Sequence, residues 1–191
     1  MHEGIEVKRV RRSHIFEREG EDFYVEPRWC STRLLEVEEF FGSIWDPAAG
    51  MGRIGDAVND AGLQVELSDV CQRVPGIFRH DFLRPTFLSV ANNIITNPPF
   101  DLSREFAEQA LKLARCKVAM IFPTRRLNAA SWLEATPLAR IWLMTPRPSM
   151  GPGRLALQGI EARGDTKDYC WLVWVLGYED TPQMKWLHRD A

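Results

Sequence analysis

An asparagine, two prolines and a phenylalanine follow directly after a run that is typical of a buried strand. In the segment IITNPPFD, Asn97, Pro98, Pro99 and Phe100 come after residues 94–96. Each proline fixes its own φ and holds the residue before it out of the helical region, so this stretch is stiff. The side-chain carbonyl of Asn97 and the backbone carbonyl of Pro98 would then be two acceptors at fixed positions. Such a pair suits a planar amino group, because each acceptor takes one N–H and frees the nitrogen lone pair to attack an electrophilic methyl group.

Phe100 is predicted to offer a ring face on which a flat base can stack, a contact typically worth about 1–3 kcal/mol. The alternative is a proline-ended strand followed by a helix that Asp101 or Ser103 caps. That alternative accounts for the prolines and leaves Asn97 and Phe100 unexplained. We therefore predict that residues 97–100 are catalytic.

A glycine-containing turn stands earlier in the chain, in the segment DPAAGMG. Asp46 and Pro47 open this segment, and Gly50 and Gly52 allow the chain to turn tightly and let the backbone approach a ligand. The helix expected after the turn would point its amino end at that ligand. The segment lacks the third glycine of a dinucleotide fingerprint at the usual place, and an ordinary strand-to-helix turn is the alternative.

Two acids stand where a ligand at this turn could reach them. Asp69 ends the second predicted strand, where a carboxylate can accept hydrogen bonds from both hydroxyls of a ribose; the alternative is a helix cap. Asp81, in RHDFL, could accept a hydrogen bond from the exocyclic amine of an adenine; the alternative is an acid in a surface loop. The glycine turn and Asp69 together favour an adenosine-containing ligand that has no pyrophosphate.

The elements that must position these residues follow from the hydrophobic pattern. Strands are predicted in the segments SIWD, LQVELSDV, NNIIT, KVAMIFP, ARIWLM and YCWLVWVLG. Helices are predicted in RIGDAVNDAG, which Gly62 terminates, in SREFAEQALKLARC, and after Ser31 and Thr32, which could cap a helix. Strands that alternate with helices indicate a mostly parallel sheet covered on both faces, whose ligands lie at the carboxyl ends of the strands.

Length and composition indicate one globular domain. The chain has 191 residues, of which 45% are hydrophobic, and a net charge of −2. We expect a flexible basic arm over residues 1–22 and a single domain over 23–191, with a long loop-rich insertion around 124–167. No apolar run could span a bilayer and no secretory signal is visible, so we expect a cytoplasmic protein without a membrane partner. The cysteines have no metal or disulfide spacing and are expected to be reduced: Cys30, Cys71, Cys116 and Cys170.

The order of the segments FYVEPRWC, DPAAGMG, HDF, TNPPF and VAMIFPTR, with Asp69 among them, resembles that of the class I S-adenosylmethionine-dependent methyltransferases. Within that class it resembles the amino-group methyltransferases that form N6-methyladenine in DNA. The resemblance covers about residues 23–126, with DYCWLVWV as a late strand of the same fold. It implies an α/β, Rossmann-like fold with a seven-stranded, mostly parallel sheet, helices on both faces and an antiparallel last strand.

The resemblance also implies a cofactor, S-adenosyl-L-methionine, and the residues that bind it. Tyr24 and Pro27 match a segment that touches the methionine end of the cofactor. The other implied cofactor residues are Asp46, Pro47, Gly50, Gly52, Asp69, Asp81 and Asn97. No metal is expected, because a sulfonium methyl is already activated and the protein needs only to align the amine, exclude water and tune the amine.

The chain departs from this family in two respects. Ala49 stands where many such enzymes carry a bulkier or aromatic residue. The sequence also shows no separate target-recognition domain, so recognition of DNA would have to come from loops. Residues 125–167 carry a net charge of about +4, enough to follow phosphates in a salt-sensitive way. The nucleic-acid contacts expected there, each with a solvated surface residue as the alternative, are Arg125, Arg126, Arg147 and Arg154.

The expected partner is DNA, with RNA or protein as alternatives. Related motifs occur in enzymes that methylate a glutamine side-chain amide in release factors and in enzymes that act on guanine N2 of ribosomal RNA. Phe100 in place of a tyrosine, and the early YVEP segment, favour adenine in DNA. An inactive cofactor-binding regulatory module is the alternative from a different class, and a damaged motif would distinguish it. We expect a monomer or a weak homodimer.

Overall fold

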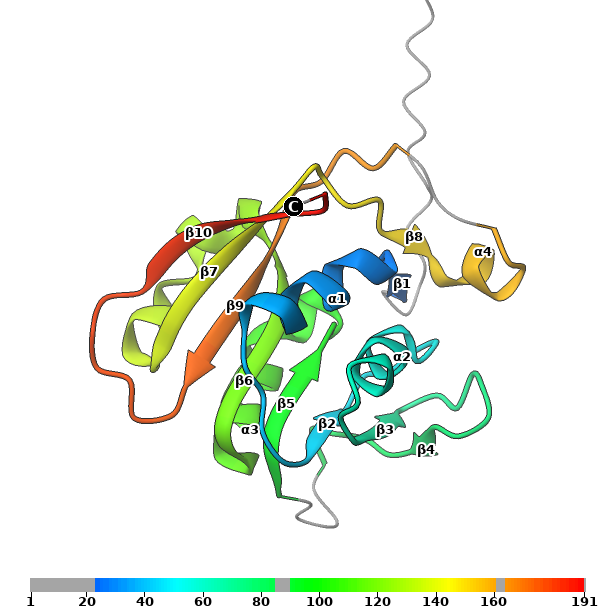
Figure 1. Cartoon of the computed structure of the whole chain (residues 1–191), viewed down its shortest axis with the longest axis horizontal. Coiled ribbons are helices and arrows are strands. Elements are labelled where there is room, and N and C mark those ends of the chain that lie inside the picture. Colours follow the sequence, from blue (N-terminus) through cyan, green and yellow to red (C-terminus); the bar gives the residue numbers. More distant parts are fainter. Residues whose placement is uncertain (1–22, 85–89, 161–163, 191) are drawn as a thin grey trace, which may run out of the picture.

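Short runs of β-branched and aromatic residues form the strands of a central sheet, as their strand propensity predicts. The computed structural model describes residues 23–84, 90–160 and 164–190, and the basic arm expected over 1–22 lies outside the described residues. Within the described residues, eight strands pair in one sheet (Figure 1). In spatial order they are β10 (Gln183–His188), β7 (Leu138–Thr145), β9 (Tyr169–Val175), β6 (Ala114–Pro123), β5 (Ala91–Thr96), β2 (Ile44–Asp46), β3 (Val65–Asp69) and β4 (Phe78–Arg79).

The strand directions confirm the α/β class and the mostly parallel sheet. β9 runs antiparallel to both of its neighbours, β6 and β7, and the other neighbouring strands run parallel. The described sheet holds one strand more than the expected seven. The additional strand is β10, which pairs with the edge of β7 from Gln183 opposite Arg140 to His188 opposite Thr145.

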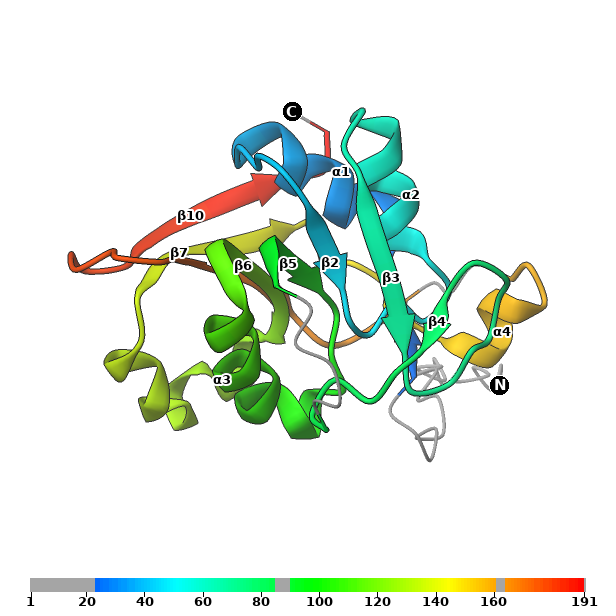
Figure 2. The ribbon, with the colours of Figure 1, turned by 90° about the horizontal axis from the view of Figure 1, so that it is seen from below.

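Helices cover both faces of the sheet, as expected. Figure 2 shows α1 (Arg28–Val37) and α2 (Arg53–Asp60) on one face and α3 (Ser103–Leu113) on the other. The short 3-10 helices η2 (Thr124–Ala129) and η3 (Ser131–Ala135) lie on the same face as α3.

Successive side chains of β6 are buried on opposite faces of the sheet, against the helices that cover each face. Val118 and Met120 belong to an apolar cluster that includes Phe106 of α3. Ala119 and Ile121 belong to the cluster on the opposite face, which includes residues of α1 and α2. Successive side chains of a strand point to opposite faces, so one continuous apolar run packs against helices on both sides.

Helix α1 begins earlier than expected. Ser31 and Thr32, the expected caps, lie inside the helix, and Ser31 is buried. Pro27 is the N-cap, with φ −60° and ψ 141°. Proline suits the first turn of a helix, because it needs no hydrogen-bond partner for a backbone N–H there. The end of α2 is as predicted, with Gly62 at φ 75° just after the helix.

A second sheet of two strands places the first described residues against the middle of the chain. β1 (Tyr24–Val25) pairs antiparallel with β8 (Gly151–Pro152), and α4 (Gly153–Leu157) follows β8. The Phe23 ring fills the space beside Gly153, where an added Cβ would lie 1.8 Å from a ring carbon. The Gly153 N–H also donates to the Phe23 carbonyl at 2.9 Å. A glycine is therefore required at residue 153 for β1 to dock.

The segment around 124–167 contains more regular structure than the loop-rich insertion that we expected. It includes η2, η3, β7, β8 and α4, and β7 lies inside the main sheet between β9 and β10. The apolar residues of β7 decide this, because Leu138, Trp142 and Met144 are buried.

A buried ionic cluster fixes α1 to the sheet. Glu38, just after α1, is 3% exposed and accepts hydrogen bonds from the Arg140 guanidinium, from Trp142 Nε1 at 2.9 Å and from Lys117 Nζ at 3.0 Å. Burial alone would raise the pKa of Glu38, but the hydrogen bonds from Arg140, Trp142 and Lys117 outweigh it and hold that pKa below its ordinary value.

The four cysteines are free thiols, of which Cys30 and Cys170 are buried, Cys71 is half-buried and Cys116 is exposed. Across the parts of the chain that the structure describes, the helices are too short or too polar to cross a membrane.

Candidate active site

The carboxyl ends of β2, β3 and β5 meet at a cavity of about 570 Å³. Asp46 ends β2, Asp69 ends β3, and Asn97 follows β5, and all three residues line the cavity. This is the edge of a parallel sheet at which ligands are expected, between strands whose chain connections lead to opposite sides. The volume falls within the range of about 300–1,000 Å³ that is usual for small-molecule sites.

The glycine turn adopts the tight, left-handed backbone conformation that its two glycines predict. Gly50 has φ 53° and Gly52 has φ 78°, both in the left-handed region that favours glycine. Gly50 lines the cavity, and its N–H donates to Asp69 Oδ2 at 2.9 Å. Gly52 is the buried N-cap of α2 and lies outside the cavity lining. The first glycine therefore shapes the cavity, and the second starts the helix.

Asp69 joins the glycine turn to the loop after β3. Its carboxylate is 6% exposed and accepts hydrogen bonds from the backbone amides of Gly50 and Cys71, each at 2.9 Å, and from Arg73 Nη1 at 3.0 Å. A carboxylate has about four acceptor positions, so it can still accept a hydrogen bond from a ligand. Its role toward a ribose stays a prediction.

Asn97 is held by its amide nitrogen. Asn97 Nδ2 donates to the backbone carbonyl of Tyr24 at 3.2 Å and to Glu26 Oε2 at 2.8 Å. The Tyr24 carbonyl can only accept a hydrogen bond, so this contact fixes which end of the amide is the nitrogen. Asn97 Oδ1 is buried and accepts no hydrogen bond from the described residues. A buried acceptor left unpaired costs about 1–3 kcal/mol, which a ligand with an N–H could recover.

Two buried carboxyl groups line the cavity close to Asn97. Glu26 is 7% exposed, and burial raises its pKa to about 7, although hydrogen bonds from its own backbone amide and from Asn97, and the charge of Arg53, act in the opposite direction. Asp46 is 1% exposed, and burial together with the nearby Glu26 raises its pKa well above the ordinary value. Neither carboxyl forms a salt bridge with a described residue, and a positively charged ligand would stabilise both as carboxylates.

No protein-family model matches the sequence, and no curated protein matches it at a significant level. Solved structures do match. A predicted O-methyltransferase from Agrobacterium tumefaciens aligns with a TM-score of 0.57 at 14% identity, over 84% of this chain and 85% of that one. A candidate RNA methyltransferase from Pyrococcus horikoshii aligns with a TM-score of 0.54 at 16% identity, over 78% and 81%. The methyltransferase subunit of a type I restriction-modification system from Streptococcus thermophilus aligns with a TM-score of 0.55 at 9% identity, over 78% and 43%.

The chain has the class I methyltransferase fold. Sequence identity this low establishes the fold and leaves the substrate open. In this fold the cavity lies where the residues of the glycine turn, Asp69 and Asn97 converge, so the structure brings together the two motifs singled out in the sequence.

The other predicted cofactor residues are divided between two cavities. Tyr24, Pro47 and Asp81 line the cavity described above, together with Asp46, Gly50, Asp69 and Asn97. Asp81 Oδ1 accepts a hydrogen bond from the Leu83 amide at 3.1 Å, which holds the carboxylate at the cavity wall. Pro27 instead lines a second, neighbouring cavity.

The prediction that Phe100 offers a ring face for a base to stack on is wrong. Phe100 is 7% exposed, its ring centroid lies 5.5 Å from that of Tyr169, and it belongs to the apolar cluster on the face of α1. Burial of the ring against other apolar side chains is favourable, and the 3-10 turn that begins at Phe100 directs it there. Pro99 lines the cavity, whereas Pro98 is buried and lies outside the lining.

The four arginines expected to contact nucleic acid do not line one cavity. Arg126 donates to the Phe100 carbonyl and, at 2.5 Å, to Asp101 Oδ1, so it closes the turn after β5. Arg125 and Arg154 are exposed and line neither cavity. Arg147 lines the second cavity.

The lining residues that the sequence analysis missed include Phe23, Glu26, Arg53 and Arg73. Glu26 had a signal, because it is an acid between Tyr24 and Pro27 in an otherwise apolar segment. Arg73 stands four residues after Asp69, with which it forms a salt bridge, and it lies 4.0 Å from the Phe23 ring centroid. Among the described residues, no group of three or more metal-ligating side chains is gathered in one place.

The raised pKa of Glu26 predicts a specific dependence of stability on pH. The folded state holds this proton up to about pH 7, whereas an ordinary glutamate releases it near 4.5, so the unfolding free energy falls as pH rises from 4.5 through 7. Glu26→Gln cannot ionise. The unfolding free energy of this variant minus that of the wild type should therefore increase by about 2–3 kcal/mol as the pH rises from about 5 to about 8.

Chemical denaturation at a series of pH values measures this difference. Glu105→Gln, which changes an exposed glutamate on α3, is the matched control and should track the wild type. A difference between Glu26→Gln and the wild type that is constant with pH would show that Glu26 is not buried as described.

Proposed function

We propose that the protein is an S-adenosylmethionine-dependent methyltransferase whose acceptor is an exocyclic amino group, with the N6 amine of adenine in DNA as its substrate. The observation that carries this proposal is the unpaired Asn97 Oδ1, buried at the cavity where the class I fold has its ligand edge. The likeness in fold to solved methyltransferases supports it.

The lining of the cavity fits the proposed cofactor. Asp69 would accept a hydrogen bond from one ribose hydroxyl at its remaining acceptor position, and Asp81 would face the adenine amine. Toward the Tyr24 side, Glu26 and Asp46 would complement the positive sulfonium and ammonium groups, and the Arg53 guanidinium is suited to the carboxylate. Their raised pKa values agree with this role, because a bound cation stabilises the ionised carboxylates.

The cofactor, when bound, supplies an activated methyl group. The protein then has to hold the acceptor amine in line with it and exclude water. Asn97 Oδ1 would accept one N–H of that amine, which raises the electron density on nitrogen. The amine gains the methyl group and loses a proton to solvent, so no general base is required. Glu26 acts through Asn97 as a positioning residue, because its hydrogen bond keeps the amide oxygen unpaired and available.

A paired adenine amine is out of reach inside a duplex, so the base has to leave the stack at a cost of a few kcal/mol. Phe100 cannot offset this cost by stacking, because its ring is buried. Tyr24 is the better candidate for stacking. It is half-buried and lines the cavity, and its backbone carbonyl accepts a hydrogen bond from Asn97.

An RNA base is a second candidate substrate, supported by the comparable TM-scores of the Pyrococcus and Streptococcus structures.

Asn97→Ala should abolish methyl transfer while cofactor binding survives. Removal of one preorganised hydrogen-bonding group in other enzymes lowers kcat by about 10²–10³-fold, and the amide oxygen has that role here. Single-turnover transfer of labelled methyl measures the rate, and calorimetry measures affinity for the cofactor. Asn59→Ala, on the exposed side of α2, is the control and should behave as the wild type. Full activity in Asn97→Ala would exclude this role for the amide.

Asp69→Asn should weaken binding of S-adenosylmethionine by about 1–3 kcal/mol. The substitution keeps the size of the side chain, but its amide nitrogen would face donors where the carboxylate accepted hydrogen bonds. Calorimetry with Asp56→Asn, an exposed acid of α2, as the matched control separates this effect from a general change of charge. Unchanged affinity in a folded Asp69→Asn protein would remove Asp69 from the cofactor site.

The product of the reaction identifies the substrate class. We expect label from the cofactor to appear in DNA and, after digestion to nucleosides, mass spectrometry to detect N6-methyldeoxyadenosine. Label in cytosine, in RNA or in a glutamine side chain would contradict adenine in DNA and leave the cofactor assignment standing. No labelled product from any of the three mixtures, with cofactor binding intact, would indicate an inactive cofactor-binding module.

A further inference from the structure

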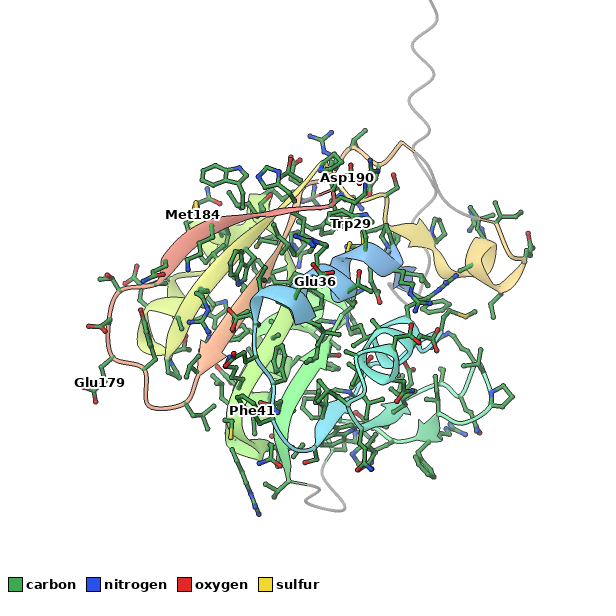
Figure 3. All side chains as sticks on the ribbon, in the orientation of Figure 1. Trp29, Glu36, Phe41, Glu179, Met184 and Asp190 are labelled. Atoms are coloured by element: carbon green, nitrogen blue, oxygen red, sulfur yellow. The ribbon has the colours of Figure 1, made fainter. Side chains whose placement is uncertain are left out.

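A second cavity, of about 610 Å³, adjoins the active site and is lined by four arginines. Its lining residues include residues from the start of α1, β8, α4 and the segments that follow β7 and β10. Figure 1 labels these elements. The four are Arg28, Arg53, Arg147 and Arg189. Figure 3 shows Trp29, which also lines it, and Asp190, the neighbour of Arg189, on the same side of the molecule. Arginines that are distant from one another in the sequence thus line the same cavity.

The lining is strongly unbalanced in charge. Glu26 is the one acid among the described residues that line the second cavity, against the four arginines. The start of α1 adds to this imbalance, because its first turn contains no acid and no side chain caps it. The cavity is therefore an environment for an anion.

Acids outside the lining do not neutralise the cavity firmly. Arg28 pairs with Asp60, Arg147 with Asp168 at 2.7 Å and Arg189 with Asp190 at 2.9 Å. All six side chains are between 46% and 71% exposed, and exposed pairs contribute little stability. Arg53 forms no salt bridge within residues 23–84, 90–160 and 164–190. A phosphate, which a guanidinium can bind through two N–H groups, can compete with such pairs.

The position of this cavity connects it to the reaction. Val25, Glu26 and Arg53 line both cavities, so β1 and the residue after it form the wall between them. Glu26 receives the hydrogen bond from Asn97 on that wall. An anion in the second cavity would thus lie beside the group that positions the acceptor amine.

We propose that the arginine-lined cavity binds the phosphate backbone of the nucleic-acid substrate next to the target nucleotide. This inference rests on the proposed function for its choice of ligand. It replaces the surface expected from sequence, since of those four arginines only Arg147 takes part. Several guanidiniums around one cavity favour a chain of phosphodiesters over an isolated carboxylate, because successive phosphates can occupy successive arginines.

Binding of a fluorescent DNA oligonucleotide to the full chain, followed by anisotropy over a range of salt concentrations without turnover, tests the inference. The double variant Arg147→Gln and Arg189→Gln should bind at least tenfold more weakly. Its log–log salt slope should be flatter by about two, because two phosphate contacts are removed. Both arginines are exposed, so the fold should survive, and calorimetry should show unchanged affinity for S-adenosylmethionine.

Two further double variants complete the design. Arg104→Gln with Arg115→Gln changes exposed arginines that line neither cavity and should bind DNA as the wild type does. Arg125→Gln with Arg126→Gln tests the surface expected from sequence. Unchanged DNA binding in Arg147→Gln with Arg189→Gln, or a loss confined to Arg125→Gln with Arg126→Gln, would overturn the inference.

Absence of DNA binding by the wild type would also overturn the inference. The proposed methyl transfer is judged separately, from the labelled product and from cofactor binding. Binding that depends on Arg147 and Arg189 in a protein that transfers no methyl group would support the phosphate site and refute the activity.

Discussion

The hydrogen bonds from the Asn97 amide to Tyr24 and Glu26 are the constraint on which the site depends. They use both amide N–H groups and leave the carbonyl oxygen as a buried acceptor, in a residue whose backbone the following prolines stiffen. That arrangement requires β1 to lie over the end of β5. Pairing of β1 with β8, and the fit of Phe23 beside Gly153, place it there.

Burial of Glu26 and Asp46 opposes stability in the absence of a ligand. Each carboxyl would be better solvated at the surface, and each has a raised pKa as a result. A cationic ligand removes this unfavourable interaction. The free energy that burial of the two carboxyls costs on folding is then partly recovered when the ligand binds. The Glu38 cluster shows the contrast within the same chain, because there Arg140 and Lys117 compensate a buried carboxylate inside the protein and stabilise its ionised form.

The parts of this site that could be predicted from sequence are those fixed by local chemistry. A left-handed turn at Gly50, an acid at the end of β3 and a stiff Asn-Pro-Pro segment each depend on a few neighbouring residues. The direction of the Phe100 ring could not be predicted, because it depends on packing against Tyr169. Glu26 stands out in the sequence as an acid in an apolar segment, but its burial beside Asn97 could not be predicted. Neither could the arginine-lined cavity, since both require β1 to pair with a strand that lies far along the chain.

A crystal structure of the protein with S-adenosylhomocysteine tests the central claim, that the cavity at the ends of β2, β3 and β5 is the cofactor site beside a catalytic amide. The account predicts that a ribose hydroxyl donates a hydrogen bond to Asp69 and that the sulfur faces Asn97, with Asn97 Nδ2 still bound to Glu26. A ligand outside this cavity, or an Asn97 amide turned so that its oxygen is paired within the protein, would contradict it.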